Sequence, residues 1–124
     1  MDSSLYEQVG GEQFFVRLVD AFYAGVENDV ILRAMYPEDL TESKRHLVWF
    51  LVQYWGGPTT YMQERGHPRL RMRHAPFHID KRARDAWLVA MNAALEGVRA
   101  DLTEEQFDEM TAYFDMAARQ MRNV

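Results

Sequence analysis

The sequence of 124 residues contains no cysteine, which excludes disulfide bonds, thiolate metal sites and a cysteine nucleophile. It has no run approaching the roughly 20 apolar residues that a membrane-spanning helix needs. Its start, MDSSLYEQ, lacks the basic region and the apolar stretch of a secretory signal. The net charge of -5 argues against a general affinity for nucleic acid. We therefore expect a cytoplasmic protein with no membrane span and no nucleic-acid partner.

What is present is typical of a folded protein. Apolar residues make up 48% of the chain and charged residues 27%, which are ordinary values for a globular domain. The length predicts a single domain over residues 1–124 with one modest core. Eight methionines and a 13% share of aromatic residues suit either an ordinary core or a pocket for a flat apolar ligand.

The hydrophobic pattern predicts an all-α fold. No stretch alternates convincingly over the length of a strand, whereas apolar residues recur at helical spacing. The predicted stripes are Phe15, Leu18, Val19, Phe22 and Val26; Leu47, Phe50, Leu51 and Tyr54; Ala83, Trp87, Ala90, Met91, Ala94 and Val98; and Phe107, Met110, Phe114, Ala117 and Met121. Predicted helices cover about residues 5–9, 12–28, 30–35, 41–55, 80–98 and 104–121. Gly10-Gly11 and Gly56-Gly57-Pro58 end two of them, Asp80 caps the long fifth helix, and Thr103–Gln106 has the form of a capping box before the last.

The segment Tyr61–Ile79 interrupts these helices and is rich in arginine and proline. Loops longer than about 12–15 residues inside compact domains are usually functional or disordered. Apolar side chains such as Leu70 and Phe77 argue against disorder here. We therefore interpret the segment as a shaped binding site with about one helical turn over residues 70–74.

His74 is the histidine with the strongest case as a metal ligand. The spacing of His67, His74 and His78 is too irregular to predict a three-histidine zinc site. One histidine suffices when a porphyrin supplies the other four nitrogens. On the residues alone, a capping or core role for His74 is the simpler alternative.

Several motifs together resemble the group II truncated haemoglobins. They are YWGGP at 54–58, RGHPRLRMRHAPF at 65–77, RDAWL at 84–88, FYA at 22–24, YPED at 36–39 and the pair Gly10-Gly11. This resemblance implies a truncated globin fold, a two-over-two helical sandwich around haem b, with His74 as the proximal ligand of a pentacoordinate iron. It also implies reversible binding of dioxygen, carbon monoxide, nitric oxide or peroxide on the other side of the iron.

The same resemblance assigns the distal side. Tyr23, Tyr36 and Trp87 fall at positions whose O–H and N–H donors converge on the ligand, and buried donors need partners. Ser43 falls where many globins carry a gating histidine, so a small side chain leaves that entrance open. Taken singly, each of these residues has an ordinary alternative role in core packing, a turn or a solvated helix start.

The remaining assignments concern the cofactor itself. Contacts with the propionates are expected from Arg73, Tyr61 and His46, because guanidinium and phenol are suitable donors for a carboxylate. The residues expected to surround the macrocycle are Leu47, Phe50, Leu51, Phe77 and Met91. Solvated surface is the alternative for the other arginines of the segment, Arg65, Arg69 and Arg71.

The sequence is consistent with three candidate functions. The first is a dioxygen-binding haem protein with slow ligand release, served by an unknown reductase and capable of forming a homodimer. The second is a peroxidase-like protein, or one that detoxifies nitric oxide or peroxide, because the distal donors could polarise a bound peroxide. The third is a haem-free helical module that uses its arginines on an acidic partner. Visible colour and a Soret band separate the third from the first two.

Overall fold

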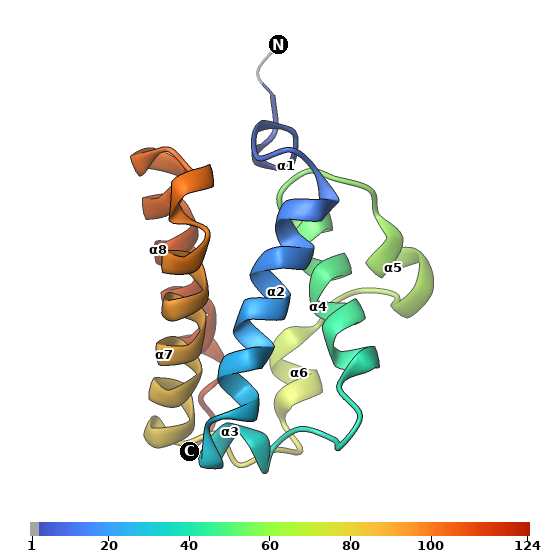
Figure 1. Cartoon of the computed structure of the whole chain (residues 1–124). Helices are drawn as coiled ribbons and strands as arrows, with labels where there is room; N and C mark the ends of the chain where they lie inside the picture. The colour runs from blue at the N-terminus through green and yellow to red at the C-terminus, as the bar shows by residue number, and fades with distance from the viewer. Residues whose placement is uncertain (1–2) are drawn as a thin grey trace.

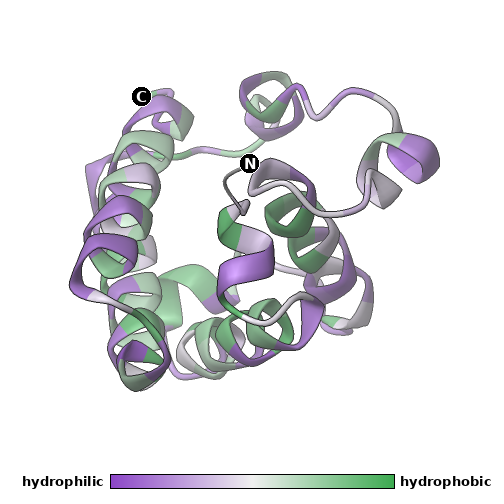
Figure 2. Cartoon of the chain, turned by 90° about the horizontal axis from the view of Figure 1, so that it is seen from above, coloured by the Kyte–Doolittle hydropathy of each residue, from purple (hydrophilic) through white to green (hydrophobic). Residues whose placement is uncertain are grey.

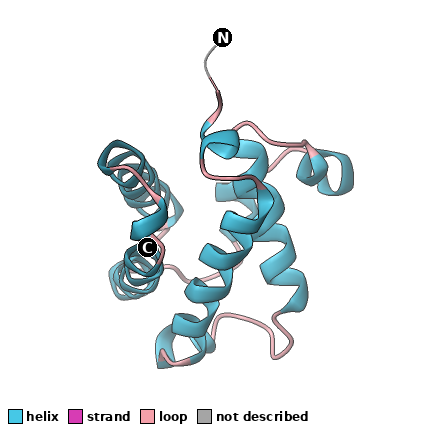
Figure 3. Ribbon diagram, turned by 45° about the horizontal axis from the view of Figure 1, so that its top comes forward, coloured by secondary structure: helices cyan, strands magenta, loops and turns pink. Residues whose placement is uncertain are grey.

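A computed structural model describes residues 3–124, and helix is the only regular secondary structure in this part of the chain (Figure 3). The helices are α1 Leu5–Gln8, α2 Glu12–Glu27, α3 Val30–Arg33, α4 Thr41–Tyr54, α5 Thr60–Arg65, α6 Leu70–His74, α7 Lys81–Gly97 and α8 Glu104–Met121, with a 3-10 turn at Arg99–Asp101. Over the same residues, none of the helices has the length and apolar character needed to cross a membrane. The predicted all-α class is confirmed.

The four long helices form two antiparallel pairs. Helix α2 packs against α4 on one side and against α7 on the other, and α7 pairs with α8. Figure 1 shows α7 and α8 together at one side of the molecule and α2 beside α4. Seen from above, the helices turn much of their hydrophobic surface toward one another (Figure 2). The predicted two-over-two sandwich is therefore the observed architecture.

Helix α2 is the centre of this packing. The stripe expected on it is completely buried, at Phe15, Leu18, Val19, Phe22 and Val26. Tyr23, at the edge of that stripe, is buried as well. A helix buried on more than one face has a wider apolar surface than a simple amphipathic helix. This explains why Phe14, outside the predicted stripe, also belongs to the core.

The local start signals were predicted correctly. Ser4 caps α1. The Asp80 carboxylate accepts a hydrogen bond from the Ala83 N–H at 2.9 Å, at the first turn of α7. Thr103 and Gln106 form the reciprocal capping box at the start of α8. Such caps satisfy the backbone donors that a helix start leaves without partners.

Two elements differ from the sequence-based prediction. Helix α5 lies in the segment that was expected to be loop up to residue 70. Six residues are too few for periodicity to reveal, and the helix depends on the burial of Tyr61, which is 4% exposed and packs edge-to-face on Phe50. Helix α3 ends at Arg33, two residues before the predicted end.

Helix α4 has two apolar faces, where the sequence suggested one. Val48, Leu51 and Val52 are buried in the core. Leu47 and Phe50 are only half-buried and line a cavity. Tyr54, expected on the same stripe, is 51% exposed. The second face therefore serves the site rather than the core.

Candidate functional site

A cavity of about 390 Å³ lies between the two helix pairs and the α5–α6 segment. Its size falls within the range of small-molecule pockets, roughly 300–1,000 Å³. It brings together most of the side chains singled out in the sequence: Tyr23, Tyr36, Ser43, His46, Leu47, Phe50, Leu51, Tyr61, Arg73, His74, Phe77 and Trp87. Segments far apart in the chain thus contribute to one enclosed, largely apolar space.

Met91 is the exception among the predicted residues. Its side chain is completely buried in the hydrophobic core and lies outside the lining of the cavity. Met91 follows Trp87 by one helical turn, so both were placed on the same stripe of α7. The stripe is correct, but the cavity extends only as far as Trp87.

Sequence reasoning missed part of the wall. Leu32 and Met35 close the cavity near α3, and Tyr113, Phe114 and Met121 line it from α8. The apolar stripe of α8 was recognised as helical, yet periodicity cannot distinguish a face that packs on another helix from one that faces a ligand.

His74, the last residue of α6, has a defined tautomer. Its Nδ1 lies 2.6 Å from the carbonyl oxygen of Leu70, one turn earlier in the same helix. Because a carbonyl can only accept, Nδ1 carries the proton and Nε2 keeps its lone pair. A neutral imidazole oriented in this way is ready to bind a metal through Nε2.

No other side chains complete a metal site of the usual kind. Across residues 3–124, no group of three or more histidine, aspartate and glutamate side chains is arranged to hold a metal ion. A metal bound by His74 would therefore have to arrive with its other ligands, as it does in a porphyrin.

The residue that anchors α6 was not anticipated. Asn123 follows α8, and its side chain donates to the carbonyl oxygens of Phe77 at 2.8 Å and His74 at 3.3 Å and accepts from the Ile79 N–H at 3.0 Å. Its own backbone N–H donates to the Ile79 carbonyl at 2.9 Å. Beside it, Arg71 donates to the Gln120 carbonyl at 3.1 Å. No local pattern in the sequence marks such a contact.

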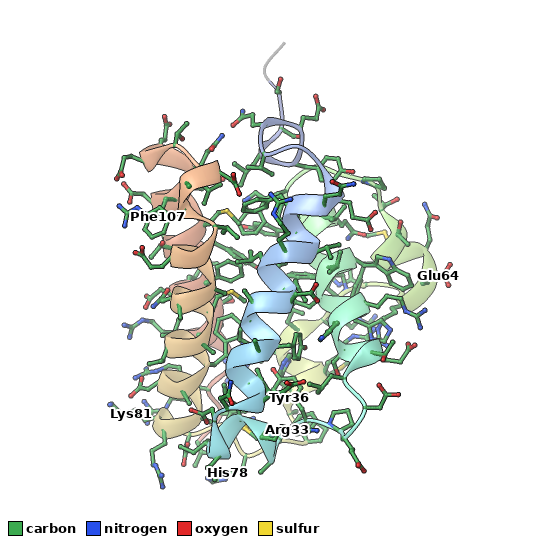
Figure 4. The ribbon with its side chains drawn as sticks, viewed as in Figure 1. Arg33, Tyr36, Glu64, His78, Lys81 and Phe107 are labelled. Atoms are coloured by element: carbon green, nitrogen blue, oxygen red, sulfur yellow. The ribbon has the colours of Figure 1, made fainter. Side chains whose placement is uncertain are left out.

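Four other polar side chains meet in the cavity. Tyr23 comes from α2, Tyr36 from the turn after α3, Ser43 from α4 and Trp87 from α7. The rings of Tyr23 and Tyr36 meet edge-to-face, with centroids 5.5 Å apart. Against the larger effect of burial, hydrogen bonding with Ser43 lowers the pKa of Tyr23, and hydrogen bonding with Trp87 and Tyr23 lowers that of Tyr36. Tyr36 lies at the end of α2 nearest α3 (Figure 4). Polar groups from four segments thus meet in one part of the cavity.

Burial controls the ionisation of these phenols. Desolvation is the largest cause that raises the pKa of Tyr23, and the neighbouring Tyr36 raises it further. Desolvation likewise raises the pKa of Tyr36, against the hydrogen bonds from Trp87 and Tyr23. Both side chains therefore remain protonated donors throughout the physiological pH range.

The arginine-rich wall is organised around Tyr61. Arg73 donates from Nε to the Pro68 carbonyl at 2.7 Å and from Nη2 to the Arg65 carbonyl at 2.8 Å. Arg65 Nη1 lies 3.2 Å from Nδ1 of His46. Both guanidinium groups lie within about 6 Å of the Tyr61 ring. Desolvation first, and then the charge of Arg65, lowers the pKa of His46, which favours its neutral form.

Alkaline titration tests the buried phenols. Unfolded tyrosines ionise near pH 10, whereas Tyr23 and Tyr36 have raised pKa values when folded. Stability conferred by these groups is present below about pH 10 and declines as the pH rises further, because only the unfolded state ionises. In denaturant, the Tyr36→Phe variant should give less phenolate absorbance than the parent, because one titrating phenol is gone. In the native titration near pH 10 the two proteins should give equal absorbance, because Tyr36 does not ionise there in the folded parent. A loss in the native titration would contradict the assignment.

Comparison with known proteins identifies the fold. Residues 4–123 match the family model of the bacterial-like globins. The group 2 truncated haemoglobin YjbI of Bacillus subtilis is 41% identical over 95% of this chain and 87% of its own. The crystal structure of haemoglobin from Chloroflexus aurantiacus shares 53% identity, with a TM-score of 0.94 over 99% of this chain and 100% of that one.

A second similar crystal structure is that of the truncated oxygen-avid haemoglobin from Bacillus subtilis. Its X-ray structure has 40% identity and a TM-score of 0.90, covering 98% of this chain and 100% of that one. These similarities extend over nearly the whole sequence and include both the helical frame and the segments that form the cavity. The chain therefore belongs to the group II truncated haemoglobins, a family of haem-binding globins that take up small gaseous ligands.

Proposed function

We propose that the cavity binds haem b with His74 as its single protein ligand to iron, and that the protein binds dioxygen reversibly and releases it slowly. One observation carries the proposal: the hydrogen bond from His74 Nδ1 to the Leu70 carbonyl, at 2.6 Å, which leaves Nε2 available. The distal residues provide hydroxyl donors and no second imidazole, which favours a pentacoordinate iron.

The walls fit this cofactor. Leu47, Phe50, Leu51 and Phe77 offer apolar and aromatic surface to a flat macrocycle. For the two carboxylates of haem b, the polar residues Tyr61, Arg73 and His46 lie together in the same cavity, as proposed from the sequence. The hydrogen bonds of Arg73 to the loop leave its charge intact, so it can still attract a carboxylate. Arg65, which lines the cavity beside His46, joins this group.

When bound, the haem iron supplies the reversible coordination of a diatomic ligand. The residues of the chain determine how long the ligand stays. Tyr36 lies beside Tyr23 and Trp87, whose hydrogen bonding would orient its hydroxyl before a ligand arrives. A ligand that took up partial negative charge there would be stabilised by such an oriented donor in a largely apolar cavity.

Slow release is supported by this donor set and by similarity to the oxygen-avid haemoglobin of Bacillus subtilis. A protein that holds dioxygen firmly is poorly suited to delivering it. Ligand sensing or scavenging therefore fits the site better than transport does.

The iron ligand is tested by replacing His74 with alanine. Loss of the imidazole should abolish tight haem binding, or leave weakly held haem with an altered ferrous spectrum, because His46, the other imidazole that lines the cavity, is expected beside the haem carboxylates. Soret absorbance after reconstitution measures both outcomes. His67→Ala and His78→Ala are matched controls and should retain the parental spectrum. A His74→Ala protein with full haem occupancy and an unchanged spectrum would refute the assignment.

The distal donors are tested by oxygen release. A hydrogen bond to a charged or strongly polar group is worth roughly 1.5–3 kcal/mol, so removal of one should raise the dissociation rate about ten- to a hundredfold. Stopped-flow measurement should show this for Tyr36→Phe, and a smaller effect for Trp87→Phe and Tyr23→Phe, whose hydrogen bonding is to Tyr36.

Carbon monoxide supplies the control for that experiment, because it is a poorer hydrogen-bond acceptor than dioxygen. Its release should change little in any of the three variants. Equal acceleration of carbon monoxide and dioxygen in Trp87→Phe would mean that the aromatic side chains act only by steric packing.

The anchor of the proximal helix is tested at Asn123. Asn123→Ala removes three side-chain hydrogen bonds to residues 74–79, each worth about 0.5–1.5 kcal/mol. We expect haem transfer to an apoglobin acceptor to accelerate about tenfold and the iron–histidine stretching band in the Raman spectrum to shift. Arg122→Ala is the matched control, since its side chain bonds only to the Val124 carbonyl among residues 3–124. Identical spectra and haem-loss rates in the two variants would show that Asn123 does not position His74.

A further inference from the structure

The charge of the molecule is distributed unevenly. Residues 60–79 contain four arginines, Arg65, Arg69, Arg71 and Arg73, and only one acidic residue, Glu64, although the chain as a whole has a net charge of -5. The remainder of the protein is therefore strongly acidic. We call these four side chains the arginine surface.

The arginine surface is not neutralised by the protein itself. Elsewhere, exposed bases such as Arg17, Arg99 and Arg119 pair with carboxylates. In the part of the chain that the structure describes, the four arginines form no ion pair. Their partners are neutral: carbonyl oxygens for Arg71 and Arg73, and a histidine whose pKa is lowered for Arg65.

The arginine surface adjoins the opening of the cavity. Arg65 and Arg73 line the cavity itself, and Arg69 and Arg71 are exposed at the start of α6. Helix α5 lies at the edge of the molecule, on the side away from α7 and α8, whereas α6 packs against α8 (Figure 1). Glu64 points outward from α5 (Figure 4), so it does not screen the residues around α6. Positive charge is thus concentrated around the opening of the cavity.

We propose that the arginine surface docks an acidic electron-donor protein that reduces the iron of haem held in the cavity. This inference rests on the proposed function, because dioxygen binds only to ferrous haem and iron that has become ferric must regain an electron. The donor gives up one electron and iron(III) becomes iron(II). No covalent bond forms or breaks and no proton is transferred. An acidic partner is favoured because unpaired arginines guide and orient an oppositely charged surface.

Nucleic acid is the other polyanion to consider. The acidic remainder of this chain would repel a long polyphosphate, whereas a small acidic protein contacts one face only. The acidic protein is therefore the better match, since Arg65 and Arg73 would also hold the haem carboxylates and the exposed charge at the start of α6 belongs to Arg69 and Arg71.

The experiment uses the haem-loaded ferric protein and a reduced, acidic plant-type ferredoxin as the probe. The second-order rate of reduction should fall steeply as ionic strength rises. The double variant Arg69→Glu with Arg71→Glu should lower that rate about tenfold or more at low ionic strength, and should weaken the binding of oxidised ferredoxin measured by calorimetry. Oxygen and haem dissociation are compared in Arg69→Glu alone, which leaves the Arg71 contact with Gln120 intact, and should stay at parental values because Arg69 does not line the cavity.

The matched control is Arg17→Glu with Arg99→Glu, which changes the net charge equally where α2 meets the turn between α7 and α8. It should change the rate less than twofold. The Arg71→Lys variant keeps the charge but not the guanidinium fork, so its haem iron should be reduced at the parental rate. Slower reduction of this variant would mean that the contact with Gln120 matters and docking does not.

The remaining outcomes distinguish failure of this proposal from failure of the proposed function. Equal slowing in the two charge-reversal variants would mean that only net charge matters and would overturn the proposal. Reduction that is independent of salt would do the same. A DNA duplex that binds the parent but not the Arg69→Glu, Arg71→Glu variant, with ferredoxin kinetics unchanged, would assign the arginine surface to nucleic acid instead. Absence of a Soret band in the reconstituted parent would refute the proposed function itself.

Discussion

The hydrogen bond between His74 and the Leu70 carbonyl is the constraint on which the site depends. It fixes which imidazole nitrogen is protonated and keeps the ring aligned with a helix of only five residues. A helix so short has little stability of its own, because nucleation costs more than one turn returns. The bond therefore has value only while Asn123 and Arg71 fasten α6 to α8. Proximal chemistry and tertiary packing form a single arrangement in this protein.

The distal side follows a different physical logic. Its phenols and indole belong to long helices or lie next to them, and ring packing with Phe22 holds them in place. Hydrogen bonding among these groups offsets part of the cost of burying them. A ligand entering this space meets donors that need little reorganisation. The rigid core thus positions the distal donors, and the fastened short helix α6 positions His74 on the opposite side.

Much of this arrangement could be predicted from the sequence, for reasons that particular residues make clear. The stripe from Phe15 to Val26, the cap at Asp80 and the capping box at Thr103 are local signals, and each was found where expected. Motif resemblance selected residues that the structure gathers in one cavity. Helix α5 and the anchor at Asn123 were missed, because both depend on contacts between residues distant in sequence. Met91 lies in the core outside the cavity lining, and the sequence did not reveal this, because periodicity defines a face of a helix but not how far along it a cavity extends.

The hydrogen bonds of Asn123 join residues 44 to 49 positions apart. Contacts of that separation form late, because the intervening chain must be ordered before they close. During synthesis, α2 and α4 can collapse on their apolar stripes long before residue 123 has emerged from the ribosome. The segment that carries His74 acquires its final geometry only after α8 has docked. Capture of the cofactor is consequently coupled to completion of the fold, and a partly synthesised chain would hold the apolar walls of the pocket without a fixed ligand for iron.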